Sequence, residues 1–129
     1  MAYNFLVVDD STTTRAIIKR ILGLSAVPIG ELYEADNGEA ALEVLKDNWV
    51  DLVFADINMP KMNGIEMVQR MSEDGLLQSI PVVIVSSDGS EARIEELMSK
   101  GVRAYLKKPF TPENIKESID EILGGAKNE

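Results

Sequence analysis

The chain has 129 residues, a length that predicts one domain. Apolar residues make up 45% of it and charged residues 27%, which is typical of a soluble globular protein. The formal net charge is −9, from 13 basic and 22 acidic residues. Phosphate groups and anionic lipids are bound by basic surfaces, so this charge disfavours binding to nucleic acid and to membranes.

Two residue types are missing, and their absence excludes whole classes of chemistry. Without cysteine there is no disulfide framework, zinc–cysteine cluster or thiol nucleophile. Without histidine there is no Ser-His-Asp triad, no histidine metal site and no histidine that could be phosphorylated within the chain itself. The chemistry left uses carboxylates, hydroxyls, lysine and a hard cation bound through oxygen.

Near the N-terminus, only four consecutive apolar residues precede Asp9, which is too few for a signal peptide. No apolar run approaches the length of a membrane span. We therefore expect a cytoplasmic protein without membrane insertion.

Short apolar runs alternate with helical patterns along the chain. The predicted strands are 5–8, 31–35, 51–55, 82–85 and 103–107. A helix is predicted after each strand, with Ser11, Ser90 and Thr111 as N-caps and with Gly23 and Gly101 as stops. Residues 24–30 form a loop, and residues 124–129 form a polar tail that we expect to be frayed.

The pattern of the strands predicts an α/β fold. Nearly continuous apolar strands indicate a sheet that is buried on both faces, hence a parallel sheet with helices on either side. Five such βα units account for the whole chain, and we expect residues 1–129 to form a single domain.

Polar side chains follow four of the five predicted strands. They are Asp9 and Asp10 after the first strand, Asp56 after the third, Ser86 and Ser87 after the fourth, and Lys108 after the fifth. In parallel α/β sheets, binding sites gather at the carboxyl ends of the strands. We therefore expect these groups to converge.

Converging carboxylates need a positive partner. At an effective dielectric constant of about 20, two such charges roughly 4 Å apart cost on the order of 4 kcal/mol. Oxygen ligands favour Mg²⁺ or a similar hard cation, and Lys108 adds a second positive charge. Together with the Ser86 hydroxyl, they predict a site for a phosphoryl group, with a carboxylate as the nucleophile.

With these residues at its strand ends, the chain resembles the receiver domains of bacterial two-component response regulators, especially the single-domain chemotaxis (CheY-like) type. The matching segments are VDDS at 8–11, DLVFADINMP at 51–60, MNG at 62–64, VIVSS at 83–87 and YLKKPF at 105–110. They occur in order along essentially the whole chain. The resemblance implies a flavodoxin-like (βα)5 fold with strand order 2-1-3-4-5.

The resemblance also implies a phosphorylation site that depends on Mg²⁺ or Mn²⁺. Asp56 would accept the phosphoryl group and also ligate the metal. Asp10 would ligate the metal directly, Asp9 would do so through water, and the backbone carbonyl of Asn58 would be a further ligand. The side chains of Asn58 and Asp88 would tune the lifetime of the acyl phosphate.

Other residues would bind the phosphoryl group and switch the conformation. Lys108 would contact the phosphoryl group and pair with Asp56 before phosphorylation, and Ser87 would lie beside it. Ser86 would be the switch hydroxyl, at a position where threonine is commoner in the family. Tyr105 would be the aromatic residue whose rotamer follows Ser86. In the family the bond that here joins Lys108 to Pro109 is commonly cis.

Each of these residues alone also has a simpler explanation. Asp9 and Asp10 could cap a helix, and Asp56 could belong to an ordinary turn. Ser86 could be a solvated loop hydroxyl and Lys108 a surface lysine, while Tyr105 could be an exposed aromatic on an edge strand. Their joint occurrence at the strand ends favours the phosphoacceptor.

We therefore expect a monomeric signalling protein rather than an enzyme. A sensor histidine kinase or a phosphotransfer protein would supply the phosphoryl group, since the chain has no histidine of its own. A downstream protein would bind the face formed by the fourth helix, fifth strand and fifth helix, possible outputs including chemotaxis.

Two alternatives remain open. One is a small phosphohydrolase that uses an aspartyl phosphate, although the Asp-x-Asp motif of the haloacid-dehalogenase-like enzymes is missing. The other is a receiver-like module that binds its partners without phosphorylation.

Overall fold

The computed structural model describes residues 2–87 and 91–124. Its centre is a parallel sheet in the order β2-β1-β3-β4-β5. The strands are β1 (Tyr3–Val8), β2 (Ile29–Ala35), β3 (Leu52–Ala55), β4 (Val82–Ser86) and β5 (Ala104–Lys107). The helices are α1 (Thr12–Leu24), α2 (Gly38–Asp47), α3 (Gly64–Ser72), α4 (Glu91–Ser99) and α5 (Pro112–Ile119), the last extended by a π-helical turn, Asp120–Gly124. The predicted α/β fold and strand order are confirmed.

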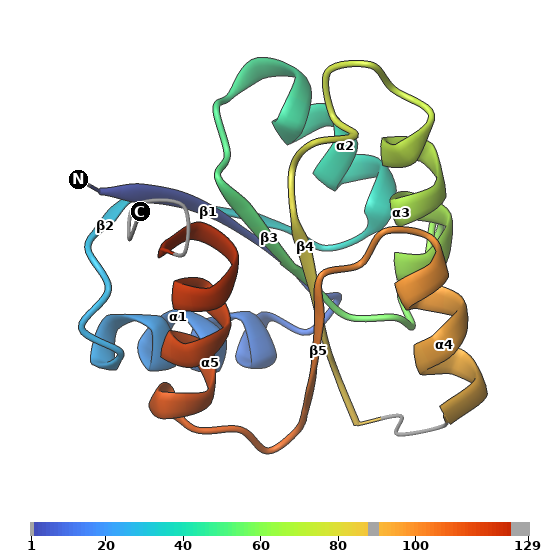
Figure 1. Ribbon diagram of the computed structural model, residues 1–129. Coiled ribbons are helices and arrows are strands. Elements are labelled where there is room, and N and C mark those ends of the chain that lie inside the picture. The colour runs from blue at the N-terminus through green and yellow to red at the C-terminus, as the bar shows by residue number, and fades with distance from the viewer. Residues whose placement is uncertain (1, 88–90, 125–129) are drawn as a thin grey trace.

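The sheet separates two apolar layers (Figure 1). Leu6 and Val8 of β1 face the layer that contains α2, α3 and α4. Phe5 and Val7 of the same strand face α1 and α5. Alternating side chains of one strand are thus buried on opposite sides, which explains why the strand is apolar throughout.

Several predicted boundaries differ from the structure. β1 begins at Tyr3 rather than at residue 5, β3 and β5 each begin one residue later than predicted, and β4 ends one residue later. Two further differences have local physical reasons. The first helix does not stop at Gly23 but continues to Leu24, and Ser25 is its C-cap. The residue with positive φ at this end is Ala26, at 64°, so Gly23 is not used for its conformational freedom. β2 starts at Ile29 rather than at residue 31, because Ile29 pairs with Tyr3 across an irregularity in the β1–β2 ladder.

At the C-terminal end, Gly124 closes the π-helical turn and therefore does not belong to a frayed tail. Residues 125–129, the predicted cap Ser90 and the predicted lifetime-tuning residue Asp88 lie outside the described residues. Among the described helices, none is both long enough and apolar enough to cross a bilayer.

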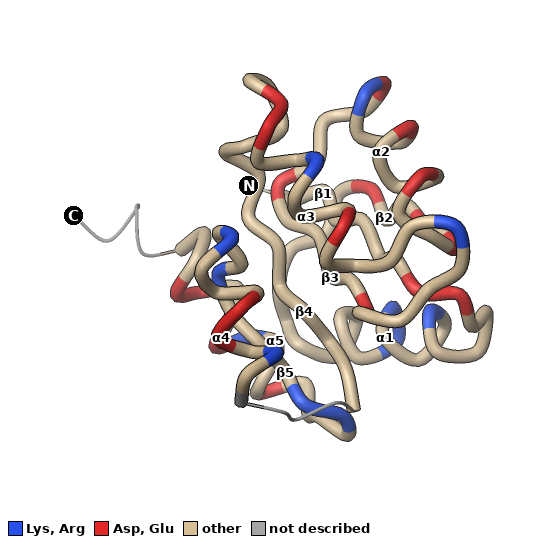
Figure 2. The backbone as a smooth tube through the Cα atoms, turned by 90° about the vertical axis from the view of Figure 1, so that its right-hand side faces the viewer, with Lys and Arg blue, Asp and Glu red and all other residues tan. Residues whose placement is uncertain are grey.

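Charged residues are dispersed over the surface. In the view of Figure 2, basic and acidic positions are interspersed over the described part of the chain, but not evenly. α1 contains three basic residues and no acidic ones, whereas α2 contains three acidic residues and one basic residue.

Candidate functional site

The site begins with two aspartates that directly follow adjacent strands. Val8 of β1 is in register with Ala55 of β3. The next residues, Asp9 and Asp56, therefore lie beside each other, and the Asp56 amide donates to the Val8 carbonyl at 3.0 Å. Sheet register thus joins residues that are far apart in the sequence.

Lys108 lies between these two carboxylates. Its Nζ is 3.4 Å from Asp9 Oδ2 and 3.5 Å from Asp56 Oδ2. The Lys108 amide also donates to the Ser86 carbonyl at 2.9 Å, which fixes the start of the following loop to the end of β4. The bond between Lys108 and Pro109 is cis, as the resemblance implied. The expected convergence of β1, β3 and β5 ends is therefore present.

The Asp56 side chain is held by a hydrogen bond and is also partly exposed to solvent. Its Oδ1 accepts a hydrogen bond from the Ile57 amide at 2.7 Å, while Oδ2 faces Lys108. The side chain is 16% exposed, so an incoming group can reach it. Gly64, the first residue of α3, packs against the Asp56 backbone so closely that a Cβ there would collide with the Asp56 carbonyl oxygen.

Asp9 is more deeply buried, with 2% of its side chain exposed. Its Oδ1 accepts from the Ser11 amide at 2.9 Å. Burial raises the pKa of Asp9, and the neighbouring Asp56 charge raises it further, whereas the Ser11 amide and Lys108 act in the opposite direction. A divalent cation would remove much of the remaining cost of keeping this carboxylate charged.

Asp10 does not join the two other aspartates. It is exposed, as is Asn58. Within residues 2–87 and 91–124, no three acidic side chains are grouped so that they could hold a metal ion. The expected convergence of three carboxylates is therefore reduced to two carboxylates and a lysine.

The donor set still fits Mg²⁺. This ion keeps several waters and is usually bound through one or two carboxylates together with phosphate oxygens. Asp9 and Asp56 supply the two carboxylates. Asp10, which is exposed, follows Asp9 directly, and Asn58, which is also exposed, lies two residues beyond Asp56.

The proposed switch residues occupy β4 and β5. Ser86 is 2% exposed, so it is not the solvated loop hydroxyl of the simpler explanation, whereas Ser87 is exposed. Tyr105 is in register with Ile84, and its hydroxyl oxygen is buried. Its ring packs against the α2–α4 layer. Tyr105 is thus turned inward in this structure.

The structure also shows which residue is the N-cap of α1. The Ser11 hydroxyl, and neither Asp9 nor Asp10, accepts a hydrogen bond from the Thr14 amide at 3.1 Å. The carboxylates of the acidic pair are therefore not used as helix caps.

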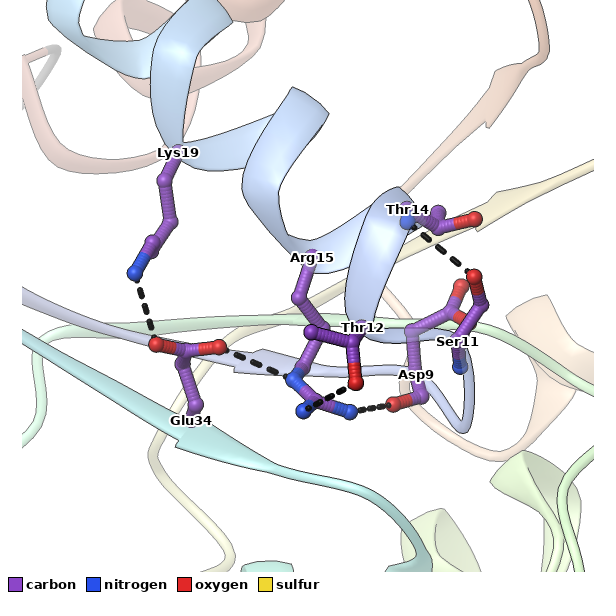
Figure 3. A network of polar contacts seen from close by, with 7 residues as sticks. All are labelled: Asp9, Ser11, Thr12, Thr14, Arg15, Lys19 and Glu34. Atoms are coloured by element: carbon purple, nitrogen blue, oxygen red, sulfur yellow. Dashed lines mark hydrogen bonds and ion pairs between the residues drawn. The ribbon is translucent and has the colours of Figure 1, made fainter.

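One contact was not anticipated from the sequence. Arg15 of α1 donates to the Asp9 carbonyl and to Glu34 of β2 (Figure 3). A sequence signal existed in principle, since Arg15 is a cation near the start of a helix, where the helix dipole disfavours positive charge.

Comparison with known proteins agrees with this architecture. The response regulator receiver domain family matches residues 5–120. A chemotaxis protein CheY homolog of Campylobacter jejuni is 36% identical over 125 residues, which cover 96% of this chain and 95% of the relative. Chemotaxis protein CheY1 of Helicobacter pylori is 38% identical over 120 residues, covering 92% of this chain and 95% of the relative.

The same likeness is seen among solved structures. Chemotaxis protein CheY4 of Vibrio cholerae superposes with a TM-score of 0.84 at 26% identity, covering 95% of this chain and 100% of that one. A CheY-like receiver domain protein of Methanospirillum hungatei has a TM-score of 0.84 at 24% identity, a likeness of fold, over 99% of this chain and 98% of that one. The chain belongs to the response regulator receiver domain family.

Proposed function

We propose that this protein is a phosphorylation-dependent signalling switch whose phosphoacceptor is Asp56. The observation that carries the proposal is Lys108, whose Nζ lies 3.4 Å from Asp9 and 3.5 Å from Asp56 at the ends of adjacent strands. A lysine between a buried and an accessible carboxylate can balance the charge that a phosphoryl group brings.

In the reaction, Asp56 Oδ2 attacks the phosphorus of a partner's phosphohistidine. An O–P bond forms and the P–N bond breaks, so that the electron pair of the P–N bond returns to the imidazole, which takes a proton. Mg²⁺ or Mn²⁺, when bound, neutralises charge on the phosphoryl oxygens. Asp9, Asp10, Asp56 and the Asn58 carbonyl would hold the ion.

The residues around Asp56 have distinct roles in the proposed phosphoryl transfer. The Ile57 amide orients the carboxylate through Oδ1, which leaves Oδ2 directed toward Lys108. After transfer, Lys108 pairs with a phosphoryl oxygen. The Ser86 hydroxyl donates to another, and Ser87 lies at the rim of the site. Asn58 and Asp88 would influence how fast water reaches the acyl phosphate.

The output is a change in protein binding. Movement of Ser86 toward the phosphoryl group would free the space into which Tyr105 turns further, altering the face of α4, β5 and α5. A shift from 1:99 to 99:1 needs about 5.5 kcal/mol of differential stabilisation, which charge-assisted contacts of a phosphoryl group can largely supply. The names of the relatives, which are chemotaxis proteins, support a role in chemotaxis signalling. We further propose that the protein is a cytoplasmic monomer that is phosphorylated by a histidine kinase or a phosphotransfer protein.

The test is labelling with acetyl phosphate and Mg²⁺, followed by mapping of the modified residue by mass spectrometry. We expect one phosphoryl group at Asp56, and a weaker Mg²⁺ titration for Asp10→Ala. Modification at another residue, or no modification of folded protein, would contradict the proposal. Rapid turnover of p-nitrophenyl phosphate would instead support a phosphohydrolase.

The switch is tested separately with Ser86→Ala. We expect the variant to be labelled at Asp56 but to respond weakly, with a smaller gain in partner binding when beryllofluoride and Mg²⁺ are added. A full response in the variant would remove Ser86 from the switch.

A further inference from the structure

Arg15 occupies an unfavourable place for a cation. It is the fourth residue of α1, and the first turn of this helix contains no acidic residue that would compensate its charge. The positive end of the helix dipole lies at this turn. The side chain is nevertheless only 14% exposed. A conflict between a local rule and the observed residue is typical of positions that serve a site.

The guanidinium is held from several sides (Figure 3). Its Nη1 donates to the Asp9 backbone carbonyl at 2.6 Å, and its Nε donates to Glu34 Oε1 at 2.9 Å. Its Nη2 donates to the Thr12 hydroxyl at 3.4 Å. The second oxygen of Glu34 accepts from Lys19 Nζ at 2.6 Å. Hydrogen bonds from Lys19 and Arg15 lower the pKa of Glu34, which therefore stays charged.

The contact with the carbonyl fixes the peptide unit between the two aspartates. The Asp9 carbonyl and the Asp10 amide lie in one plane, so an anchor on the oxygen sets the orientation of the whole unit. The other side of Asp9 is held as well, because its amide donates to the Ala35 carbonyl of β2 at 3.0 Å. The direction from which the exposed Asp10 side chain projects thus depends on Arg15.

We propose that Arg15 is a positioning residue for the magnesium-binding pair Asp9 and Asp10, and that Glu34 holds Arg15 in place. This inference rests on the proposed function in treating Asp10 as a metal ligand. Arg15 reaches the Asp9 carbonyl and Glu34 through two different nitrogens of its rigid fork, whereas a lysine would have to serve both acceptors from one ammonium group.

Positioning and charge predict opposite effects on Mg²⁺ binding. If Arg15 acted only through its positive charge, removing it would strengthen the binding of a divalent cation. If it positions the acidic pair, removing it weakens binding, and a lysine that keeps the charge fails to restore it.

The experiment measures Mg²⁺ affinity by isothermal titration calorimetry at fixed pH and ionic strength. We expect Arg15→Met and Arg15→Lys to raise the Mg²⁺ dissociation constant about tenfold, as is common for residues that orient metal ligands. Glu34→Gln should raise it less. Lys19→Met is the matched control, since it removes a charge from the same Glu34 without touching Asp9. Unchanged or tighter binding in both Arg15 variants would overturn the proposal.

A second readout needs neither metal nor phosphorylation. In Mg²⁺-free protein, Arg15→Lys should shift the NMR amide signals of Asp10 and Ser11, while Lys19→Met should leave them in place. Equal shifts in the two variants would contradict positioning. If Arg15→Met does not fold by circular dichroism, Arg15→Lys decides the question alone.

The two proposals fail in different ways. If the parent protein binds Mg²⁺ and the Arg15 variants lose affinity, but Asp56 is not labelled, then the proposed function fails and the positioning role stands. If Asp56 is labelled and both Arg15 variants bind Mg²⁺ like the parent, the reverse holds.

Discussion

The two ends of β3 carry an aspartate each, and the two are held in different ways. Asp51, just before the strand, accepts from the Asn4 amide at 2.7 Å and from the Trp49 indole at 3.0 Å. Asp56, just after it, accepts from one amide at 2.7 Å and faces a lysine at 3.5 Å. At the amino end, neutral donors occupy both oxygens. At the carboxyl end, one oxygen faces a lysine charge that is shared with Asp9.

In the proposed function, this difference separates a structural carboxylate, Asp51, from the phosphoacceptor, Asp56. Short hydrogen bonds to neutral groups fix Asp51 within the turn that leads into the sheet. The longer contacts of Lys108, shared between two carboxylates, leave Asp56 Oδ2 able to change partners. Residue type alone would not distinguish the two aspartates.

The largest effect expected is the contrast between the corresponding amide variants. Asp56→Asn should reduce labelling by acetyl phosphate to background with the fold intact, since an amide cannot form the acyl phosphate. Asp51→Asn should be labelled at the parent's rate but lose about 1–3 kcal/mol of unfolding free energy, because its new amide group would face a donor. Intact-mass spectrometry and urea unfolding measure the two quantities. Labelling of the same peptide in Asp56→Asn would contradict the comparison.

A smaller effect is expected at the glycine behind Asp56. Gly64→Ala would place a methyl group against the Asp56 carbonyl and should cost about 1–3 kcal/mol, as for other overpacked sites. Gly75→Ala is the control, since a Cβ there meets no atom within 4 Å. Urea denaturation of both variants would show the difference, and equal stability would mean that the loop carrying Asp56 adapts freely.

The smallest effect concerns pH. Glu34 lies near the carboxyl end of its strand and is held by cations, which lower its pKa from 4.5. Its contribution to stability is therefore present above pH 4.5 and is lost as the pH falls through the lowered value. Glu34→Gln should flatten the stability profile in this acidic range, as followed by thermal melting. Glu43→Gln, which removes an exposed pair with Lys46 at 3.5 Å, should follow the parent profile.

Much of the fold could be predicted from the sequence because the signals are periodic. The continuous apolar strands predicted burial on both faces, and the polar residues after them predicted where a site would form. The positions of Asp9, Asp56 and Lys108 around one another follow from strand register, which is confirmed in the structure.

The sequence could not give contacts that depend on three-dimensional packing. Nothing in the local pattern shows that α1 continues through Gly23, because glycine has a low helix propensity. In the structure, however, Gly23 lies between the buried residue Leu22 and the C-cap Ser25. Adjacent residues point in different directions, but the local pattern does not show which of Asp9 and Asp10 is buried and which is exposed. The hydrogen bond from Arg15 to the Asp9 carbonyl involves a backbone atom, so the sequence can mark Arg15 as an unusual cation near a helix start but cannot identify its partner.

Successive side chains of β5 pack on opposite faces of the sheet, so the proposed conformational response would begin on one face. Tyr105 packs against the α2–α4 layer, whereas its neighbours Ala104 and Leu106 pack against the α1–α5 layer. A rearrangement of this one ring would act directly on the core that contains α4. α5, the other helix of the proposed output face, packs in the opposite core, so the proposed response would move one part of that face relative to the other.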